Sequence, residues 1–279
     1  PYKDDKILTD WNGLMISAFA KAAQAFDDKI YAEAAEKSYS FIEKYLTGKD
    51  GRLIHRFRDG ESGLQAHIDD YAFMINALID LYETTFEIKF LKRAIELNEI
   101  LMKEFWDEQN GGFYFTSSKS EELIARQKDV YDGAVPSGNS VALLNLIRLS
   151  RFTGNIYFEK KASLLVKYFS GYISKSPSVF CMFMCGLDFL FSSSTEIVIV
   201  SKKKDDEAIQ GINLIRNIFN PNKIVILKSS DNQNEFGELL SFTKDMKTED
   251  NNTTFYVCRD YSCNQPVNSI KELQKLLLL

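Results

Sequence analysis

A repeated segment is the feature of this sequence that most constrains its fold. Three stretches begin with apolar residues at the spacing i, i+3, i+4, which predicts an amphipathic helix with one buried face. In each stretch a short polar turn and a second helix follow, so each is predicted to be an antiparallel αα-hairpin. The three stretches are Trp11–Leu46, Asp70–Phe105 and Gly138–Tyr172.

The segments between the hairpins are too long for an ordinary helical solenoid. The second helices begin at Tyr31, Phe90 and Phe158, about 60 to 70 residues apart, whereas solenoid repeats run about 34 to 47 residues. The additional residues include two runs typical of short strands, 52–60 and 112–116. Helical hairpins joined by such long segments, called excursions here, predict a toroid in which the excursions form the mouth. With 14 Gly and 5 Pro, a many-stranded sandwich or barrel is not expected.

The pattern changes after Ser192–Ser194, a plausible linker. Apolar runs typical of buried strands then alternate with helical segments, which predicts a small parallel sheet with covering helices. We therefore expect residues 1–193 to form a barrel domain of three hairpins plus a helix, and residues 194–279 to form a small βαβαβα domain. The predicted strands are Glu196–Val200, Lys223–Leu227 and Thr254–Cys258, and the predicted helices are Asp205–Phe219, Phe236–Phe242 and Ser269–Leu279.

Charge and hydropathy exclude several classes of partner. A net charge of -5 argues against a nucleic-acid surface or a polybasic membrane contact. The longest apolar run, Val179–Phe191, is shorter than the roughly 20 residues of a spanning helix, so no membrane segment is expected. Four Cys are too few for a disulfide scaffold, which favours a reducing, cytoplasmic location. Because the chain begins at Pro1 rather than Met, we expect a fragment of a longer protein.

The cysteines carry little chemistry in this interpretation. Cys181 and Cys185 lie at i and i+4 of an apolar helix and are expected to be inert core thiols. Cys258 and Cys263 lie at a strand end and in a loop, where a structural role is favoured over a reversible disulfide. Two thiols do not complete a tetrahedral zinc site, and neither a metal nor a cofactor is expected.

Several motifs resemble those of a known family. They are KILTDWNGLMI at 6–16, DDYAF at 69–73, FWD at 105–107, GGFY at 111–114, PSGNS at 136–140, and YVCR at 256–259 with Cys263 and Pro266-Val267. Through them the chain resembles the YyaL-like, spermatogenesis-associated protein 20 family over essentially its whole length. The resemblance implies large proteins with an amino-terminal thioredoxin-like domain and a six-hairpin (α/α) barrel akin to glycosidases and N-acylglucosamine 2-epimerase.

The family resemblance completes the predicted fold class. It is mainly α, a partial (α/α) six-hairpin toroid of the glycosidase and epimerase kind, followed by a small α/β domain. The chain resembles the C-terminal portion of such a protein, with about half of the barrel present. A site enclosed by the full ring would then be incomplete, and we expect the chain alone to be inactive. The thioredoxin-like domain is the expected partner.

Three carboxylates are the candidate catalytic residues. Asp69 and Asp70 open a helix directly after an excursion, where the helix dipole favours their ionised form. In a barrel mouth one of them would act as acid or base on a sugar, with a partner carboxylate several ångströms away. Asp132 is the candidate partner, although an Asp-Gly turn alone explains it. Helix capping is the simpler explanation of Asp69 or Asp70 alone, as for Asp10 and Ser137.

Polar and aromatic residues at the equivalent helix starts form a candidate sugar-binding set. A pyranose has an apolar face and a rim of hydroxyls, so its sites combine aromatic rings with amide and hydroxyl groups. Trp11 and Tyr71 are equally explained as the first core contacts of their hairpins. Arg58, on a predicted strand, would meet an acidic sugar or face solvent. The predicted substrate-binding residues are Trp11, Asn12, Tyr71, Arg58, Asn139 and Ser137.

Two further features have simple structural explanations. His55 and His67 are the only histidines, and sugar 2-epimerases of this architecture use paired histidines for proton transfer. Because these two flank one excursion instead of coming from separate hairpins, surface or loop positions are favoured. Lys202–Lys204 follow a strand without a glycine-rich loop, so a solvated turn is favoured over a phosphate site.

The predicted function is carbohydrate processing at the barrel mouth, by epimerisation or isomerisation of a sugar or by glycosidic cleavage. The expected ligand is a small-molecule carbohydrate. The alternative is a non-catalytic scaffold or ligand-sensing domain for the thioredoxin-like domain. Convergence of Asp69, Asp70, Asp132, Trp11 and Tyr71 on one concave pocket would favour the first function over the second.

Overall fold

The computed structural model describes residues 3–120, 125–203, 205–229, 236, 239–259 and 262–278. They form two compact units. Unit 1 comprises Pro1–Leu146 and Phe158–Leu187, and unit 2 comprises Ile147–Tyr157 and Asp188–Leu279. The chain therefore contributes two separate segments to unit 2, and the domain boundary at residue 194 stays a prediction.

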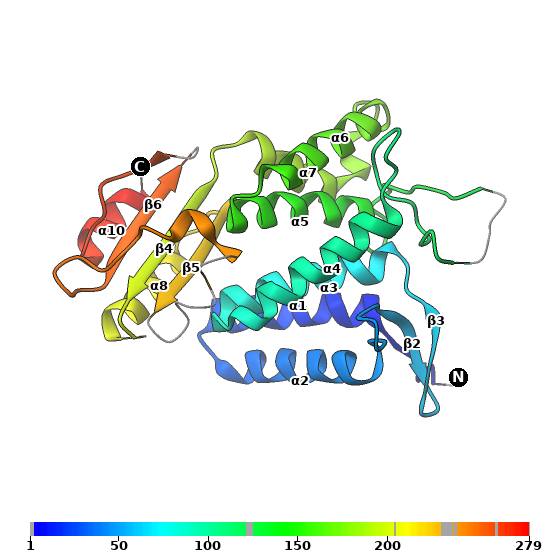
Figure 1. Cartoon of the computed structure of the whole chain (residues 1–279), viewed down its shortest axis with the longest axis horizontal. Helices are drawn as coiled ribbons and strands as arrows, with labels where there is room; N and C mark the ends of the chain where they lie inside the picture. The colour runs from blue at the N-terminus through cyan, green and yellow to red at the C-terminus, as the bar shows by residue number, and fades with distance from the viewer. Residues whose placement is uncertain are drawn as a thin grey trace. The chain divides into compact units, whose positions relative to one another are not determined.

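The helices expected from the repeat are all present (Figure 1). α1 (Thr9–Phe26) is joined by a short turn to α2 (Lys29–Tyr45), α3 (Ile68–Thr85) to α4 (Ile88–Phe105), and α5 (Gly138–Thr153) to α6 (Ile156–Ile173). The fourth helical run forms a 3-10 turn, Pro177–Val179, and α7 (Cys181–Phe191). The fold is mainly α, as predicted.

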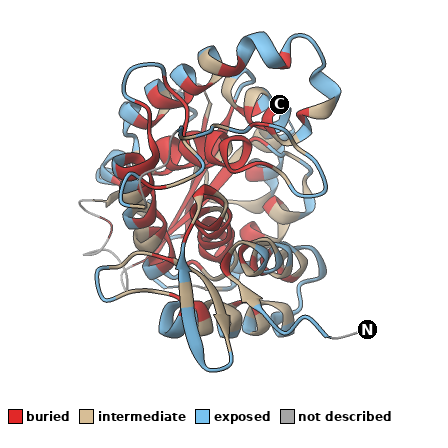
Figure 2. Ribbon diagram, turned by 90° about the vertical axis from the view of Figure 1, so that its right-hand side faces the viewer, coloured by how far each residue is buried: buried red, intermediate tan, exposed pale blue. Residues whose placement is uncertain are grey.

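α3 is the central helix of unit 1. It is buried on nearly all sides, because α1, α2 and α4 pack against it. On α5, the side-chain amide of Asn145 donates to the Ala72 carbonyl oxygen of α3 at 2.7 Å. α2 and α4 each bury one apolar face, and the opposite faces are exposed (Figure 2). The amino ends of α1, α3 and α5 are thereby held by a common packed core.

Gly13 allows α1 and α3 to approach closely. A Cβ at this position would lie 2.9 Å from the Phe73 carbonyl carbon and 3.0 Å from the Met74 nitrogen. We expect Gly13→Ala to destabilise unit 1 by about 1 to 3 kcal/mol, because backbone atoms must shift to make room. Gly171→Ala in α6 is the matched control, since a Cβ there meets nothing within 4 Å.

The measurement is denaturant unfolding followed by tryptophan fluorescence. Both tryptophans, Trp11 and Trp106, belong to unit 1, so the signal reports on this unit. Gly171→Ala is expected to be neutral or to stabilise by about 0.5 to 1 kcal/mol, since Ala loses less backbone entropy than Gly. Equal midpoints for the two variants would show that the helices do not depend on the close contact.

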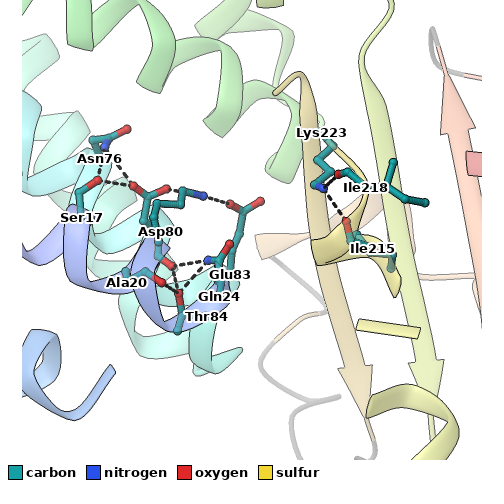
Figure 3. Close-up of polar contacts among 11 residues, drawn as sticks. Ser17, Ala20, Gln24, Asn76, Asp80, Glu83, Thr84, Ile215, Ile218 and Lys223 are labelled. Atoms are coloured by element: carbon teal, nitrogen blue, oxygen red, sulfur yellow. Dashed lines mark hydrogen bonds and ion pairs between the residues drawn. The ribbon is translucent and has the colours of Figure 1, made fainter. Parts of the chain in front are cut away.

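A polar seam joins α1 to α3 (Figure 3). The Ser17 hydroxyl donates to Asp80 at 2.5 Å, and the Asn76 amide donates to both residues. The Lys21 ammonium lies 3.1 Å from Asp80 and 3.3 Å from Glu83. Because the buried carboxylates are paired in this way, the seam fixes the register of the two helices without leaving an isolated charge.

The strand predicted within residues 52–60 is confirmed, whereas residues 112–116 do not form a strand. β1 (Ile7–Leu8), β2 (Ile54–Arg58) and β3 (Glu61–Gln65) form an antiparallel sheet in that order. In 112–116 only an isolated bridge forms, between Trp106 and Phe113. The side-chain amide of Asn139 bonds to both the N–H and the carbonyl of Phe113, in the place of a partner strand.

Unit 2 contains a mixed sheet in the order β5-β4-β6-β7. The strands are β4 (Thr195–Ser201), β5 (Lys223–Ser229), β6 (Thr254–Arg259) and β7 (Ser262–Cys263), with α8 (Asp206–Asn217), a 3-10 turn (Ser241–Thr243) and α10 (Ile270–Leu277). β4 and β5 are parallel, but β6 is antiparallel to β4. The predicted all-parallel sheet is therefore wrong, because an apolar run indicates a buried strand and not its direction. Within the helix predicted over 236–242, residues 237 and 238 lie outside the described residues, and its end forms part of the 3-10 turn Ser241–Thr243.

The cysteines differ from expectation. Cys181 and Cys185 are exposed, so the prediction of core thiols is wrong. α7 turns Phe183 and Phe189 into the core instead, and these larger apolar side chains decide which face is buried. Cys258 and Cys263 face each other across β6 and β7 and are joined by a disulfide. Within the described parts of the chain, every helix is too short or too polar to cross a bilayer.

Candidate functional site

The candidate site lies in unit 1, where the amino ends of three helices meet β2. Asp70, in the first turn of α3, is fully buried and connects them. Its carboxylate accepts from the Asp10 backbone N–H of α1 at 3.0 Å and from the His67 N–H at 2.8 Å. The Asp69 carboxylate next to it accepts from the Gly138 N–H at the start of α5. The helix starts identified in the sequence are therefore brought together by these two carboxylates.

His55 is the side chain that β2 contributes. Its Nδ1 lies 3.0 Å from both oxygens of Asp70. This hydrogen bond raises the pKa of His55, and the charge of Asp70 adds to the effect. With Nδ1 bonded to the carboxylate, Nε2 is the nitrogen left to exchange a proton with a ligand. His55 and Asp70 thus form an imidazole–carboxylate pair.

His67 lies beside this pair with the opposite electrostatic character. Its ring centroid is 5.3 Å from that of His55, and the ring stacks on Phe115 at 4.6 Å. Burial lowers the pKa of His67, because the imidazolium would lose hydration. Both histidines are partly buried; His67 lies in the loop before α3, as the expectation of a surface or loop position allowed, whereas His55 lies on β2. Two adjacent groups whose pKa values are shifted in opposite directions are suited to act as acid and base.

A small cavity of about 90 Å³ adjoins His67 through Phe115. Asp69, Asp129, Tyr131 and Ser137 contribute to its lining. Since a water molecule takes about 30 Å³, the cavity holds two or three waters or one substituent of a ligand. Burial raises the pKa of Asp69 to about 7, although the hydrogen bond from the Gly138 N–H lowers it in part. Asp69 is therefore a carboxyl group that exchanges its proton near neutral pH.

The pKa of Asp69 predicts a pH-dependent stability. Between about pH 4 and pH 7 the folded state holds a proton that the unfolded state has released, so stability falls as pH rises. We expect Asp69→Asn to raise the unfolding free energy at pH 8 by about 1 to 2 kcal/mol, a value reduced for the partly exposed carboxyl. At pH 4 the two proteins should unfold alike. A difference of the same size at both pH values would contradict this origin.

The remaining predicted catalytic residue, Asp132, lies at the start of α7. It accepts from the N–H groups of Met182 and Phe183 at 2.8 and 3.1 Å, and from the Ser137 N–H at 2.9 Å. The amino end of α7 is thereby capped. Its catalytic role stays a prediction, but Asp132 is absent from the lining of the small cavity.

Most of the predicted substrate-binding residues form hydrogen bonds or ion pairs within the protein. Trp11 is 62% exposed at the start of α1, beside Asp10. The Asn12 amide donates to the Leu8 carbonyl oxygen, and Arg58 pairs with Asp5. Ser137 caps α5 through the Ser140 N–H, as expected from the sequence. Asn139 is buried and holds Phe113.

Tyr71 belongs to a different cavity. Its hydroxyl accepts from the Leu53 N–H at 3.2 Å, and burial raises its pKa to about 12. It lines a space of about 390 Å³ together with Arg52 and Glu104, which form an ion pair. Of the five residues expected to share one pocket, Asp69 lines the small cavity, Tyr71 lines the larger one, and Asp70 bonds to His55. Asp132 accepts from the N–H of Ser137, which lines the small cavity, and Trp11 is exposed at the start of α1.

Asp10, His55 and Asp70 are also the described residues that offer metal-ligand atoms in a group, all within 4.8 Å of one another. Hydrogen bonds explain this arrangement without a cation. His55 Nδ1 is bonded to Asp70, and both Asp70 oxygens accept backbone N–H groups. Sequence reasoning missed the pairing of His55 with Asp70, although the two histidines flanking one excursion were a usable signal.

Solved structures define the class of fold. Cellobiose 2-epimerase from Bacillus thermoamylovorans matches 60% of this chain and 45% of its own chain, with a TM-score of 0.51 and 18% identity. A glycoside hydrolase family 76 α-mannanase from Bacteroides thetaiotaomicron matches 62% and 47%, with a TM-score of 0.51 and 16% identity. Unit 1 thus has part of the six-hairpin (α/α) fold of sugar epimerases and glycosidases.

Sequence relatives define the family. Spermatogenesis-associated protein 20 from Homo sapiens is 30% identical over 287 residues, and that from Mus musculus is 31% identical. An uncharacterised protein from Caenorhabditis elegans is 31% identical over 99% of this chain. The chain belongs to the spermatogenesis-associated protein 20 family. It spans 36% of the length of the human relative, and no family model matches it.

Proposed function

We propose that unit 1 carries the proton-transfer site of a sugar epimerase or isomerase. The observation that carries the proposal is the pair of adjacent imidazoles, 5.3 Å apart, whose pKa values shift in opposite directions. The fold supports the substrate class, because sugar epimerases share it. The exposed indole of Trp11, which follows Asp10 at the start of α1, would supply an apolar face for a sugar ring.

The chemistry assigns one role to each histidine. Neutral His67 removes the proton from the carbon next to the sugar carbonyl. The electron pair of the broken C–H bond forms the enediol, while the His55 imidazolium, held by Asp70, gives a proton to the carbonyl oxygen. A proton that the opposite face of the same carbon takes from solvent gives an epimer, as His55 takes back the proton of the first oxygen and His67 gives its own to solvent. Return of the proton from His67 to the neighbouring carbon, with His55 taking the proton of the other hydroxyl, gives an isomer. No electron donor or acceptor is required.

The test is incorporation of solvent deuterium into sugars, followed by NMR. The 279-residue chain, and any longer natural form of it, is incubated in D₂O with glucose, mannose and cellobiose. We expect exchange at the carbon next to the carbonyl, and its loss in the double variant His55→Gln, His67→Phe. Absence of exchange with every sugar, from both lengths of protein, would contradict the proposal.

Glycosidic cleavage is the second candidate, favoured by the pKa of Asp69 near 7, a value suited to a general acid. Reducing-end release from mannan or cellulose oligomers without deuterium in the product would favour this function, and Asp69→Asn should abolish it. A protein that binds sugars without either reaction would favour a ligand-sensing role beside the thioredoxin-like domain that the family resemblance implies.

A further inference from the structure

A second cavity of about 290 Å³ lies in unit 2. Its lining includes Ser201, Lys202, Lys228, Ser229, Lys247 and Thr248. In the parallel register of β4 and β5, Ser201 pairs with Ser229, so the carboxyl ends of the two strands lie at the same edge. In open α/β sheets, ligands bind outside the carboxyl ends of parallel strands. Here β4 and β5 are the parallel pair, and β6, antiparallel to β4, brings its amino end to the same edge.

The charged residues that line this cavity, among those the structure describes, are lysines. Three lysines come from three different segments, so the cluster arises from the fold and not from one charged run. Lys228 is only 4% exposed, and its ammonium donates to the carbonyl oxygens of Thr243 and Met246 at 2.7 and 2.9 Å and of Lys244 at 3.3 Å. These bonds hold a buried positive charge behind the cavity, with Asp245 as the acidic group that acts on it.

The cavity also presents an unused hydrogen-bonding group. Ser201 is 3% exposed, and its hydroxyl has no hydrogen-bond partner among the residues that the structure describes. A buried hydroxyl gains free energy when it finds a partner, so Ser201 is a group that a ligand in the cavity would satisfy. A hydroxyl donor beside ammonium groups is the combination that oxygen-rich anions require.

We propose that this cavity binds the phosphate group of a small phosphate ester. A phosphate monoester carries nearly two negative charges at neutral pH, which two or three ammonium groups balance and a carboxylate would not. The volume suits a small ester, since ligand pockets are typically about 300 to 1,000 Å³. Lys202 and Lys203 are exposed, in agreement with the predicted solvated turn, and Lys202 also lines this cavity, whereas Lys204 lies outside the described residues.

The experiment is calorimetric titration of the whole chain at fixed ionic strength. The probes are glucose 6-phosphate, inorganic phosphate and glucose, and the variants are Lys247→Gln and Ser201→Ala. Lys247 is exposed, and Ser201→Ala removes an unpaired hydroxyl, so both variants should remain folded. Lys203→Gln is the matched control, because Lys203 is an exposed lysine of the same turn that does not line the cavity.

We expect glucose 6-phosphate to bind, glucose not to bind, and the affinity to fall about tenfold in Lys247→Gln and about threefold in Ser201→Ala. Lys203→Gln should bind as the parent does. Inorganic phosphate binding as tightly as the ester would support the phosphate site and identify free phosphate as its source. Absence of binding by both phosphates, or equal losses in Lys203→Gln and Lys247→Gln, would overturn the proposal. Neither result depends on the sugar chemistry proposed for unit 1.

Discussion

Replacing His67 by Phe is expected to lower the rate of deuterium exchange into the sugar by about 10²- to 10⁴-fold, the usual contribution of a general base. The substitution keeps an aromatic ring against Phe115 and keeps the backbone N–H that bonds to Asp70. The fold should therefore survive while the base is lost. Exchange that continues at the parent rate would exclude His67 from the reaction.

The pH profile separates this role from a structural one. The base must be neutral and the acid protonated, so the rate rises as His67 loses its proton and falls as His55 loses its own. Because the pKa of His67 is lowered and that of His55 raised, the parent should show a bell-shaped profile with its maximum between the two pKa values. Residual exchange in His67→Phe should lack the rising limb. Gly171→Ala, remote in α6, should reproduce the parent profile.

Replacing Asp70 by Leu is expected to destabilise unit 1 by about 3 to 5 kcal/mol. The buried carboxylate accepts from the Asp10 N–H, the His67 N–H and the His55 ring, and Leu leaves all three donors without a partner. Asp70→Asn keeps one acceptor oxygen and the volume, and should cost less than half as much. Asp4→Asn, at an exposed site, should change stability by less than about 0.5 kcal/mol.

Denaturant unfolding monitored by tryptophan fluorescence measures these effects, because the buried Trp106 belongs to unit 1. The slope of the transition should stay constant across the series, which shows that only stability has changed. A Leu variant as stable as the Asn variant would mean that water replaces the carboxylate, and that Asp70 does not organise the site.

The sequence predicted the helical hairpins well because their signal is local. Each hairpin is determined by apolar spacing and a short turn within about 35 residues, and tertiary packing merely selects the buried face. The two wrong predictions, that the thiols of α7 are buried and that the sheet is all parallel, have the same cause. Nothing local states that Phe183 outcompetes Cys181 for the core, or that β6 runs against β4.

The candidate site was predicted in part. The equivalence of helix starts indicated Asp69 and Asp70 as candidates, whose role stays a prediction. The capping alternative is supported for Asp70, because its carboxylate accepts from the His67 N–H. His55 was undervalued because its partner lies on another element, and only the folded register of β2 brings them together. Asp132 was proposed from a turn motif that caps α7. The catalytic and binding roles themselves stay predictions.

Unit 2 draws on residues 147–157 as well as on the segment from Asp188 onward. The buried Arg151 lies 3.6 Å from Glu196 on β4, so the hairpin corner and the sheet are parts of one structure. A gene fusion at residue 188 would therefore separate the sheet from residues 147–157, which belong to the same unit. We expect natural chimaeras in this family to keep residues 147–157 together with the sheet.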